Sequence, residues 1–270
     1  MKRQLSVIVP VYGDWESLDE NIKHLKKHIS RFSKWEILFV NDCGPDADLI
    51  EEKIKQSIKN RKNFRYYRND KNLGFVQNCN NAVFNLTNQD NDIVLLNSDA
   101  LVTRNALQNM HKILYSKDDI GAVCPRSNAA TIFSVPMRPI DGEVYNMKRS
   151  YKLYKKIRKH LPSYYLSPIA HGFCMMIRRE VIDEHGLFDE VYGKGYGEEN
   201  DFCMRVRRKG WQCAVSNESY VFHYKARSFT EETRSEHVKK NEKILDSRYP
   251  EYRELVREYV ARVDETKLYY

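Results

Sequence analysis

Hydrophobic and polar positions alternate between two patterns along the first 125 residues. Short apolar runs rich in Val and Ile suit strands that are covered on both faces, and they fall at residues 5–12, 35–40, 64–67, 93–96 and 122–124. Between these runs, apolar residues recur at the helical spacing of three or four positions, at residues 15–32, 45–60, 74–86 and 104–115. Strands that alternate with helices predict an α/β fold with a mostly parallel central sheet flanked by helices.

The alternation ends after Pro125. Residues 126–168 are irregular, then basic and rich in Tyr, and an apolar segment follows at 172–177. A Gly-rich stretch precedes an expected helix at 199–209, and short strands are expected up to His223. Two charged helices are expected at 231–249 and 251–263, separated by Pro250. We therefore predict a domain over 1–228, with halves 1–125 and 126–228, and a C-terminal helical extension over 229–270.

The composition favours a globular chain over a disordered or membrane-spanning one. Hydrophobic residues make up 41% of the 270 positions, and no apolar run approaches the roughly 20 residues that cross a bilayer. Pro10 interrupts the apolar run near the N-terminus, which we interpret as a strand and not as a signal peptide. The six cysteines form no CxxC pair, which predicts reduced, mostly buried thiols in a cytoplasmic protein.

Positive charge is concentrated in one stretch. The net charge is +8, and residues 138–160 hold eight Lys and Arg against two acidic residues. Such a patch predicts an anionic partner. Apolar residues from Met147 to Leu161 recur at helical spacing, so the stretch predicts a basic amphipathic helix. It could lie on an anionic membrane near a lipid-linked acceptor, or it could form an acceptor-side lid with a solvated charged face.

Polar residues stand where three of the predicted strands end. These ends are Pro10-Val11-Tyr12, Asn41-Asp42 and Asn97-Ser98-Asp99. Ligands of open α/β sheets bind at the carboxyl ends of the strands. Asp42 could accept hydrogen bonds from a base or a ribose, although it could also only cap the helix after Pro45. Asp99 could hold a divalent cation against a phosphorylated ligand.

Two further blocks carry candidate chemistry. Asn72 and Gly74 precede a predicted helix, where a glycine lets a ligand approach the backbone and the helix N-terminus favours anions; a plain loop and cap is the alternative. Glu198, Glu199 and Asp201 open another helix after a Gly-rich stretch. Carboxylates that share a cleft raise one another's pKa, which suits a general base, whereas acidic residues in a first turn can also simply stabilise the helix.

A candidate metal ligand stands later in the chain. His223 ends a predicted strand, and although a single His is more often structural, a neutral imidazole could complete a metal site begun by Asp99.

Taken together, these blocks resemble the family 2 glycosyltransferases with the GT-A fold. The resemblance covers roughly residues 5–228, and the blocks occur in the family's order: SVIVPVY, FVND, NLGFVQNCN, LLNSD, GFCMMIRREVIDEHGLFDE, GYGEENDFCMR and FHY. It looks closest to the branch that includes rhamnosyltransferases and other enzymes of polysaccharide assembly. The resemblance implies an inverting, metal-dependent transfer of a sugar from a UDP- or dTDP-linked donor to a hydroxyl of a glycan or lipid-linked acceptor.

The resemblance also implies roles for individual residues. It implies nucleotide contacts by Pro10, Val11, Tyr12, Asp42, Asn72, Gly74, Asn97 and Ser98. Asp99 and His223 would bind Mn²⁺ or Mg²⁺, with Asn97 in place of the first acid of the family's metal motif. Glu199 aligns with the catalytic base and Asp201 with its partner, and the choice among these two and Glu198 stays open.

Two other classes of function compete with this one. A sugar-nucleotide pyrophosphorylase would show a Gly-rich basic loop after the first strand, but residues 13–16 read Gly-Asp-Trp-Glu. A non-catalytic module for an anionic ligand or nucleic acid would leave the carboxylates unexplained, and the chain shows no nucleic-acid motif. We therefore expect a cytoplasmic enzyme that does not bind nucleic acid and that could contact the inner face of the membrane.

Overall fold

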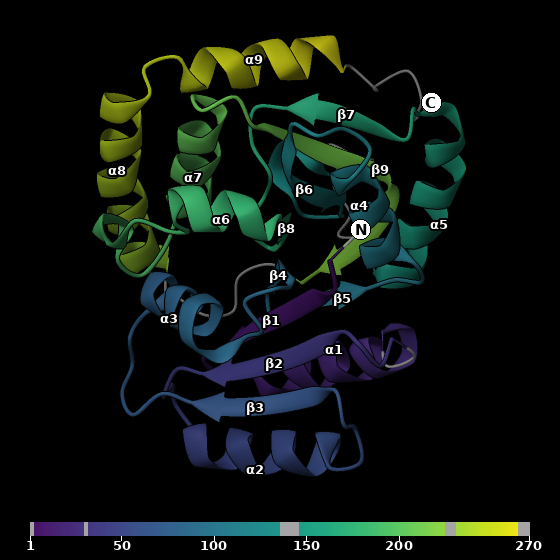
Figure 1. Ribbon diagram of the computed structural model, residues 1–270, viewed down its shortest axis with the longest axis vertical. Coiled ribbons are helices and arrows are strands. Elements are labelled where there is room, and N and C mark those ends of the chain that lie inside the picture. The colour runs from purple at the N-terminus through teal and green to yellow at the C-terminus, as the bar shows by residue number, and fades with distance from the viewer. Residues whose placement is uncertain (1–2, 30–31, 136–145, 225–230, 264–270) are drawn as a thin grey trace.

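The protein is built around one mixed β-sheet (Figure 1). The computed structural model describes residues 3–29, 32–135, 146–224 and 231–263. Within these ranges the sheet has nine strands in the order β3-β2-β1-β4-β8-β6-β9-β5, and β7 pairs with β9. The strands are β1 (Leu5–Val11), β2 (Glu36–Asn41), β3 (Phe64–Arg68), β4 (Asp92–Leu96), β5 (Ala100–Val102), β6 (Ile120–Arg126), β7 (Tyr164–Ser167), β8 (Cys174–Ile177) and β9 (Gln212–His223).

Helices cover the sheet and extend beyond it. The longer ones are α1 (Trp15–His28), α2 (Ala47–Ile58), α3 (Phe75–Asn81), α4 (Ala106–Leu114), α5 (Met147–Ile157), α6 (Arg179–His185), α7 (Glu198–Arg207), α8 (Glu231–Arg248) and α9 (Tyr252–Arg262). Short helical turns lie at Ala82–Leu86, Thr131–Phe133, Arg158–His160 and Glu190–Tyr192. None of the helices in the described ranges is long and apolar enough to cross a bilayer.

The N-terminal half follows the sequence pattern closely. Strands β3, β2, β1 and β4 pair in parallel, and every residue of β4 is buried. This burial explains the continuous apolar run, because both faces of the strand are covered. The predicted α/β fold is confirmed, and the carboxyl ends of β1, β2 and β4 share one edge of the sheet.

The second half makes the sheet mixed. β8 pairs antiparallel with both β4 and β6, while β9 pairs parallel with β6 and antiparallel with β5 and β7. The short strands expected before His223 are instead one strand of 12 residues. Strand β7, near the end of residues 126–168, was not predicted from the sequence. The basic helix predicted within 147–161 is α5 and the turn that follows it.

The C-terminal helices pack beside α7 (Figure 1). Leu245 of α8 and Tyr249, the residue that follows α8, are buried against Met204 of α7. The expected boundary at 228/229 lies outside the described residues. The six cysteines are free, and all except Cys43 are buried.

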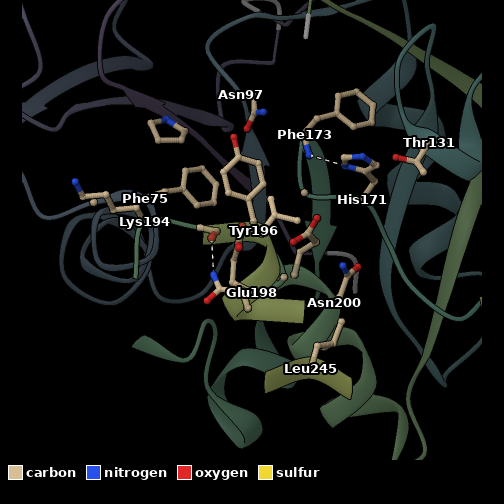
Figure 2. A pocket seen from close by; sticks show the side chains of 18 of the residues that line it. Phe75, Asn97, Thr131, His171, Phe173, Lys194, Tyr196, Glu198, Asn200 and Leu245 are labelled. Carbon is tan, nitrogen blue, oxygen red and sulfur yellow. Dashed lines mark hydrogen bonds between the residues drawn. The ribbon is translucent and has the colours of Figure 1, made fainter. Parts of the chain in front are cut away.

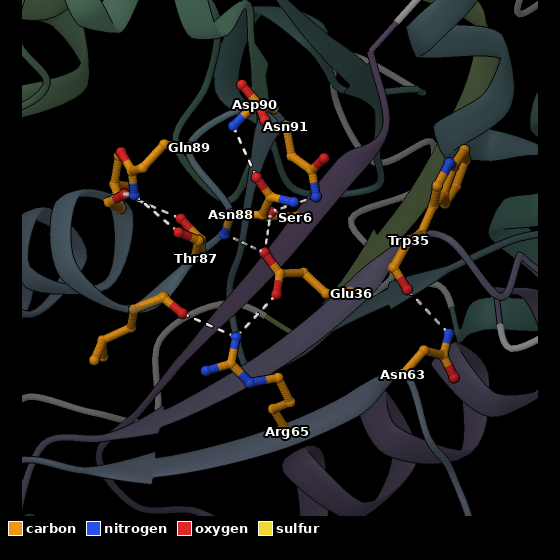
Figure 3. A network of polar contacts seen from close by, with 12 residues as sticks. Ser6, Trp35, Glu36, Asn63, Arg65, Thr87, Asn88, Gln89, Asp90 and Asn91 are labelled. Atoms are coloured by element: carbon orange, nitrogen blue, oxygen red, sulfur yellow. Dashed lines mark hydrogen bonds and ion pairs between the residues drawn. The ribbon is translucent and has the colours of Figure 1, made fainter.

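Polar groups at the start of β1, β2 and β3 bond to one another (Figure 3). Glu36 accepts hydrogen bonds from the Arg65 guanidinium at 2.9 Å, from the Asn88 N–H at 2.7 Å and from the Ser6 hydroxyl. Asn91 donates to the same Ser6 hydroxyl at 3.1 Å. These groups therefore satisfy one another at the amino-terminal ends of the strands, opposite the edge where β1, β2 and β4 end.

Candidate active site

A pocket of about 860 Å³ opens at the carboxyl edge of the parallel strands. It brings together residues that lie far apart in the sequence. The predicted site residues that line it are Pro10, Val11, Tyr12, Asp42, Asn72, Gly74, Asn97, Ser98, Asp99, Glu198, Glu199 and His223. Asp201 does not line the pocket.

Asp42 fixes the loop that precedes α3. Its Oδ1 accepts hydrogen bonds from the Asn69 side-chain amide and the Leu73 N–H, both at 2.9 Å, and its Oδ2 accepts the Gly74 N–H at 2.9 Å. Burial raises the pKa of Asp42, and these three hydrogen bonds oppose the rise. The carboxylate does not cap α2, whose N-cap residue is Asp46. Asp42 therefore ties β2 to the loop at one wall of the pocket.

Close backbone contacts shape the same wall. A Cβ atom on Gly44 would lie 1.5 Å from the carbonyl oxygen of Tyr12, so no side chain fits there. Gly74, the N-cap residue of α3, has φ +81°, a conformation that glycine adopts most readily. The expected role of Gly74 at a close backbone approach is consistent with this geometry.

Asp99 and His223 lie next to each other in the pocket. The Nε2 atom of His223 lies 3.2 Å from Oδ1 of Asp99. The Nδ1 atom of His223 lies 3.0 Å from the carbonyl oxygen of Ala129, and since a carbonyl oxygen only accepts, Nδ1 carries the proton. Nε2 is then the ring nitrogen available to a ligand, and it lies beside a carboxylate oxygen that could bind the same cation.

The donor set fits a divalent cation. Ligands bound side by side on an octahedral Mg²⁺ or Mn²⁺ lie about 3 Å apart, close to the observed 3.2 Å between Asp99 and His223. The hydrogen bond to Ala129 orients the imidazole, as in many metal-bound histidines. Among the described residues no cluster of three or more His, Cys, Asp or Glu could hold a metal alone. Further ligands would have to come from a bound molecule or water.

Two neighbouring carboxyl groups stand at the start of α7, inside the pocket. Burial raises the pKa of both Glu198 and Glu199, and the charge of Glu199 raises that of Glu198 further. Backbone N–H groups around Glu199, including that of Gly172, favour its ionised form. Its side chain packs on Gly172, where a Cβ would lie 3.4 Å from the Glu199 Cγ. Glu199 therefore ionises before Glu198, which stays protonated longer.

Asp201 points away from the pocket into a buried ion-pair network. It is fully buried, and its Oδ1 accepts hydrogen bonds from the Tyr192 hydroxyl at 3.1 Å and from Nη1 of Arg248 at 2.9 Å. Its Oδ2 lies 3.5 Å from Nε of Arg205. The structure thus separates Asp201 from Glu199, the residue with which the sequence grouped it.

Several pocket residues escaped the sequence analysis. In Figure 2 the side chain of Tyr196 extends from the Gly-rich loop towards Asn97, and its φ is +70°. A strained non-glycine residue in a pocket is typical of functional loops, and its place between two glycines is a signal that could have been used. The other missed residues include Phe75, Thr131, His171, Phe173, Lys194 and Asn200, and from α8 and α9 Val238, Asn241, Glu242, Leu245, Tyr252, Arg253, Val256 and Arg257.

Solved structures share this fold at low sequence identity. The mannosyltransferase PcManGT from Pyrobaculum calidifontis, in complex with GDP-Man and Mn²⁺, matches with a TM-score of 0.61 and 16% identity over 84% of this chain and 59% of that chain. GalNAc-T7 with UDP, GalNAc and Mn²⁺ matches with a TM-score of 0.64 and 18% identity over 84% of this chain and 45% of that chain. TarS from S. aureus matches with a TM-score of 0.57 and 16% identity, over 82% of this chain and 60% of that chain.

The matched sequence spans 59% of the PcManGT chain, 45% of the GalNAc-T7 chain and 60% of the TarS chain. The matches show the GT-A glycosyltransferase fold. No protein with a curated description matches the sequence. The family model described as glycosyl transferase family 2 matches residues 6–186, which is more than half of the chain. The chain therefore belongs to glycosyl transferase family 2.

Proposed function

We propose that the protein transfers a sugar from a nucleotide-diphosphate sugar to an acceptor hydroxyl with inversion, in a reaction that depends on a divalent cation. Family membership supports sugar transfer. The main support for the nucleotide-sugar donor, the cation and the direct displacement is that Asp42, the Asp99–His223 pair and Glu199 all line one pocket. A nucleotide wall, a cation site and a base are the parts that a direct displacement needs.

The donor would lie along the carboxyl ends of β1, β2 and β4. Pro10, Val11, Tyr12, Asp42, Asn72 and Gly74 would hold the nucleoside, and Asn97 and Ser98 would lie next to the phosphates. Asp99 and His223 would hold Mn²⁺ or Mg²⁺, which would neutralise the charge that develops on the leaving diphosphate. We propose a UDP- or dTDP-linked sugar, because Asp42 can accept a hydrogen bond from either pyrimidine. A dTDP-linked deoxysugar fits the rhamnosyltransferase-like branch.

Glu199 would act as the general base. Its carboxylate takes the proton from the acceptor hydroxyl, the hydroxyl oxygen forms a bond to the anomeric carbon, and the bond from that carbon to the diphosphate breaks. A pKa raised by burial brings a carboxylate closer to the working pH, where general bases are most effective. Glu198, whose pKa the charge of Glu199 raises further, is the weaker candidate for the base.

The acceptor would enter along α8 and α9. This wall of the pocket presents Val238, Leu245, Tyr252 and Val256. Its arginines are already paired, Arg253 with both oxygens of Asp246 at 2.8 Å and Arg257 with Glu254. Because these charges are compensated, the wall suits an uncharged part of a glycan better than a phosphate.

The basic helix α5 would serve a separate role at an anionic membrane. None of the described residues of α5 lines the pocket, which favours a role away from the pocket over a lid. Tyr154 and Ile157 are buried against Leu101, Tyr220 and Phe222, so this apolar face is not free to insert into lipid.

An exposed basic face remains for contact with a membrane. It consists of Lys148, Arg149, Lys152, Lys155, Lys156, Arg158 and Lys159. We propose electrostatic contact with anionic lipid that is weakened by salt. Sedimentation with phosphatidylserine vesicles at low and high salt tests it, and no sedimentation at low salt would refute it.

A donor screen tests the central proposal. We expect a UDP- or dTDP-sugar to raise the melting temperature only with Mn²⁺ or Mg²⁺, and NMR of the product to show an inverted anomeric configuration. No stabilisation by any nucleotide sugar with either cation would refute donor binding. The pyrophosphorylase alternative finds no support after β1, where Asp14 caps α1 by accepting the Ser17 N–H and no basic loop is present in residues 13–16.

A further inference from the structure

Helix α8 holds the Gly-rich loop that leads into the catalytic helix. Asn241 is buried, and its side-chain amide donates hydrogen bonds to the carbonyl oxygens of Tyr192 at 3.1 Å and Gly195 at 2.8 Å. One side chain thus satisfies two backbone acceptors on either side of Gly193. These contacts join α8 to residues 192–195, directly before Glu198 and Glu199.

Arg248 makes a second tie from the same helix, about two turns further on. Its Nη1 lies 2.8 Å from Oδ2 of Asp189 and 2.9 Å from Oδ1 of Asp201. Asp189 caps the turn before the loop by accepting the Val191 N–H, and Asp201 lies in the first turn of α7. The guanidinium therefore bridges the two ends of the segment that carries the carboxylates.

The loop between these two ends has little rigidity of its own. Gly193, Gly195 and Gly197 have φ values of +57°, +114° and +107°, and Tyr196 has +70°. Three glycines make many alternative backbone conformations accessible at small cost. The loop therefore depends on outside contacts to keep one conformation.

Tyr192 contacts the start of α7 and so connects it to the residues that α8 holds. Its hydroxyl donates to Asp201 at 3.1 Å. A Cβ on Gly197 would lie 3.2 Å from the Tyr192 ring, so the ring lies directly against the N-cap residue of α7. Glu199 is only two positions further on and faces the pocket from this first turn.

We propose that Asn241 and Arg248 are positioning residues for the reaction. With Tyr192 and Asp201 they form a clamp, here called the α8 clamp, that keeps the 193–197 loop ordered and Glu199 turned into the pocket. The catalytic part of this inference rests on the proposed function. Neither Asn241 nor Arg248 supplies a reacting atom, so the clamp acts on rate through Glu199.

The chain offers a matched control. Arg208, the C-cap residue of α7, forms a two-point ion pair with Glu251 at 2.9 Å. This pair also joins α7 to the C-terminal helices, but Arg208 and Glu251 do not line the pocket. Arg208→Gln therefore removes a link of the same kind without touching the loop.

The test compares Asn241→Ala, Arg248→Gln and Arg208→Gln in the full chain by hydrogen exchange and kinetics. In the two clamp variants we expect amides 193–201 to exchange about tenfold faster. We also expect kcat to fall about 10²-fold, as when a reacting group is misplaced by 1 Å, with little change in the donor KM. Arg208→Gln should leave both readouts unchanged, and Arg248→Lys should restore part of kcat because it keeps the charge.

The outcomes separate the clamp from the proposed function. Unchanged exchange at 193–201 in Asn241→Ala and Arg248→Gln would overturn the clamp whatever the activity. Faster exchange with a normal kcat would overturn the positioning role. If the native protein transfers no sugar, the proposed function fails while the exchange data still decide whether the clamp orders the loop. If Arg248→Gln does not fold, Asn241→Ala decides whether the clamp orders the loop, because it removes no charge.

Discussion

Glu198 and Glu199 provide a strict test of the mechanism, because adjacent carboxyl groups in one pocket are expected to behave differently. Replacing either by Gln keeps the size of the side chain and removes the ability to ionise. Glu199→Gln should lower the rate by orders of magnitude, whereas Glu198→Gln should lower it only a few-fold, since Glu198 keeps its proton to a higher pH than Glu199. Each variant serves as the control for the other.

The magnitude follows from the role assigned to Glu199. A general base contributes about 10²- to 10⁴-fold to the rate, which corresponds to roughly 3–5 kcal/mol of transition-state stabilisation. We expect Glu199→Gln to lower kcat by that factor. Donor affinity should not change, because the cation and nucleotide contacts come from the strand ends and not from α7.

The assay is donor turnover at saturating cation, measured across pH. The base must be ionised, so kcat/KM should fall as the pH drops through the pKa of Glu199, which burial places above the usual glutamate value of about 4.3. Glu198→Gln removes a neighbouring acid that can only raise the pKa of Glu199. In this variant the fall of kcat/KM at acid pH should therefore occur at the same pH as in the native protein or at a lower one. Near-normal turnover of Glu199→Gln, or an equal loss in both variants, would refute the assignment.

For three further substitutions the structure predicts the direction of the effect. Asp99→Asn should remove the Mn²⁺ dependence of donor binding in calorimetry with and without the metal, and an unaltered dependence would exclude Asp99 as a ligand. Gly44→Ala should weaken donor binding and lower the melting temperature, because its Cβ would lie 1.5 Å from the carbonyl oxygen of Tyr12; equal affinity and stability would contradict this. Glu198→Gln should gain stability over the native protein as the pH rises. Burial raises the pKa of Glu198 in the folded protein, so the native protein loses stability as the pH rises from the ordinary glutamate pKa to the raised one. The variant has no such loss, and a difference in melting temperature between variant and native protein that does not vary with pH would disprove this prediction.

Much of the fold could be predicted because the N-terminal strands are buried on both faces. Their continuous apolar runs and the helical spacing between them are local signals, and they placed β1 to β4 well. β5 was missed because three residues, Ala100–Val102, are too few to show a period. α6 was missed as a short helix of seven residues. The antiparallel position of β8 depends on long-range pairing that no local pattern encodes.

For the site too, some features could be deduced from the sequence and others could not. Asp42 and Asp99 follow parallel strands, so their meeting at one edge could be deduced from the strand ends. The separation of Asp201 from Glu199 could have been deduced as well: two positions on an α-helix turn the side chain by about 200°, so both cannot face one pocket. The wall formed by α8 and α9 had no such signal, because α8 has few apolar residues among many charged ones and its orientation depends on contacts such as those of Asn241.

Strand β9 has a consequence for how the protein forms during translation. Within the described residues it is the last strand of the sheet in the sequence, and β5 and β7 pair with no other strand there. While the ribosome is still making the chain up to residue 212, Asp99 has been synthesised but the imidazole at its side has not. The proposed cation site can therefore assemble only in a late step, and a nascent chain arrested before β9 would expose the unpaired edge of β6 to aggregation.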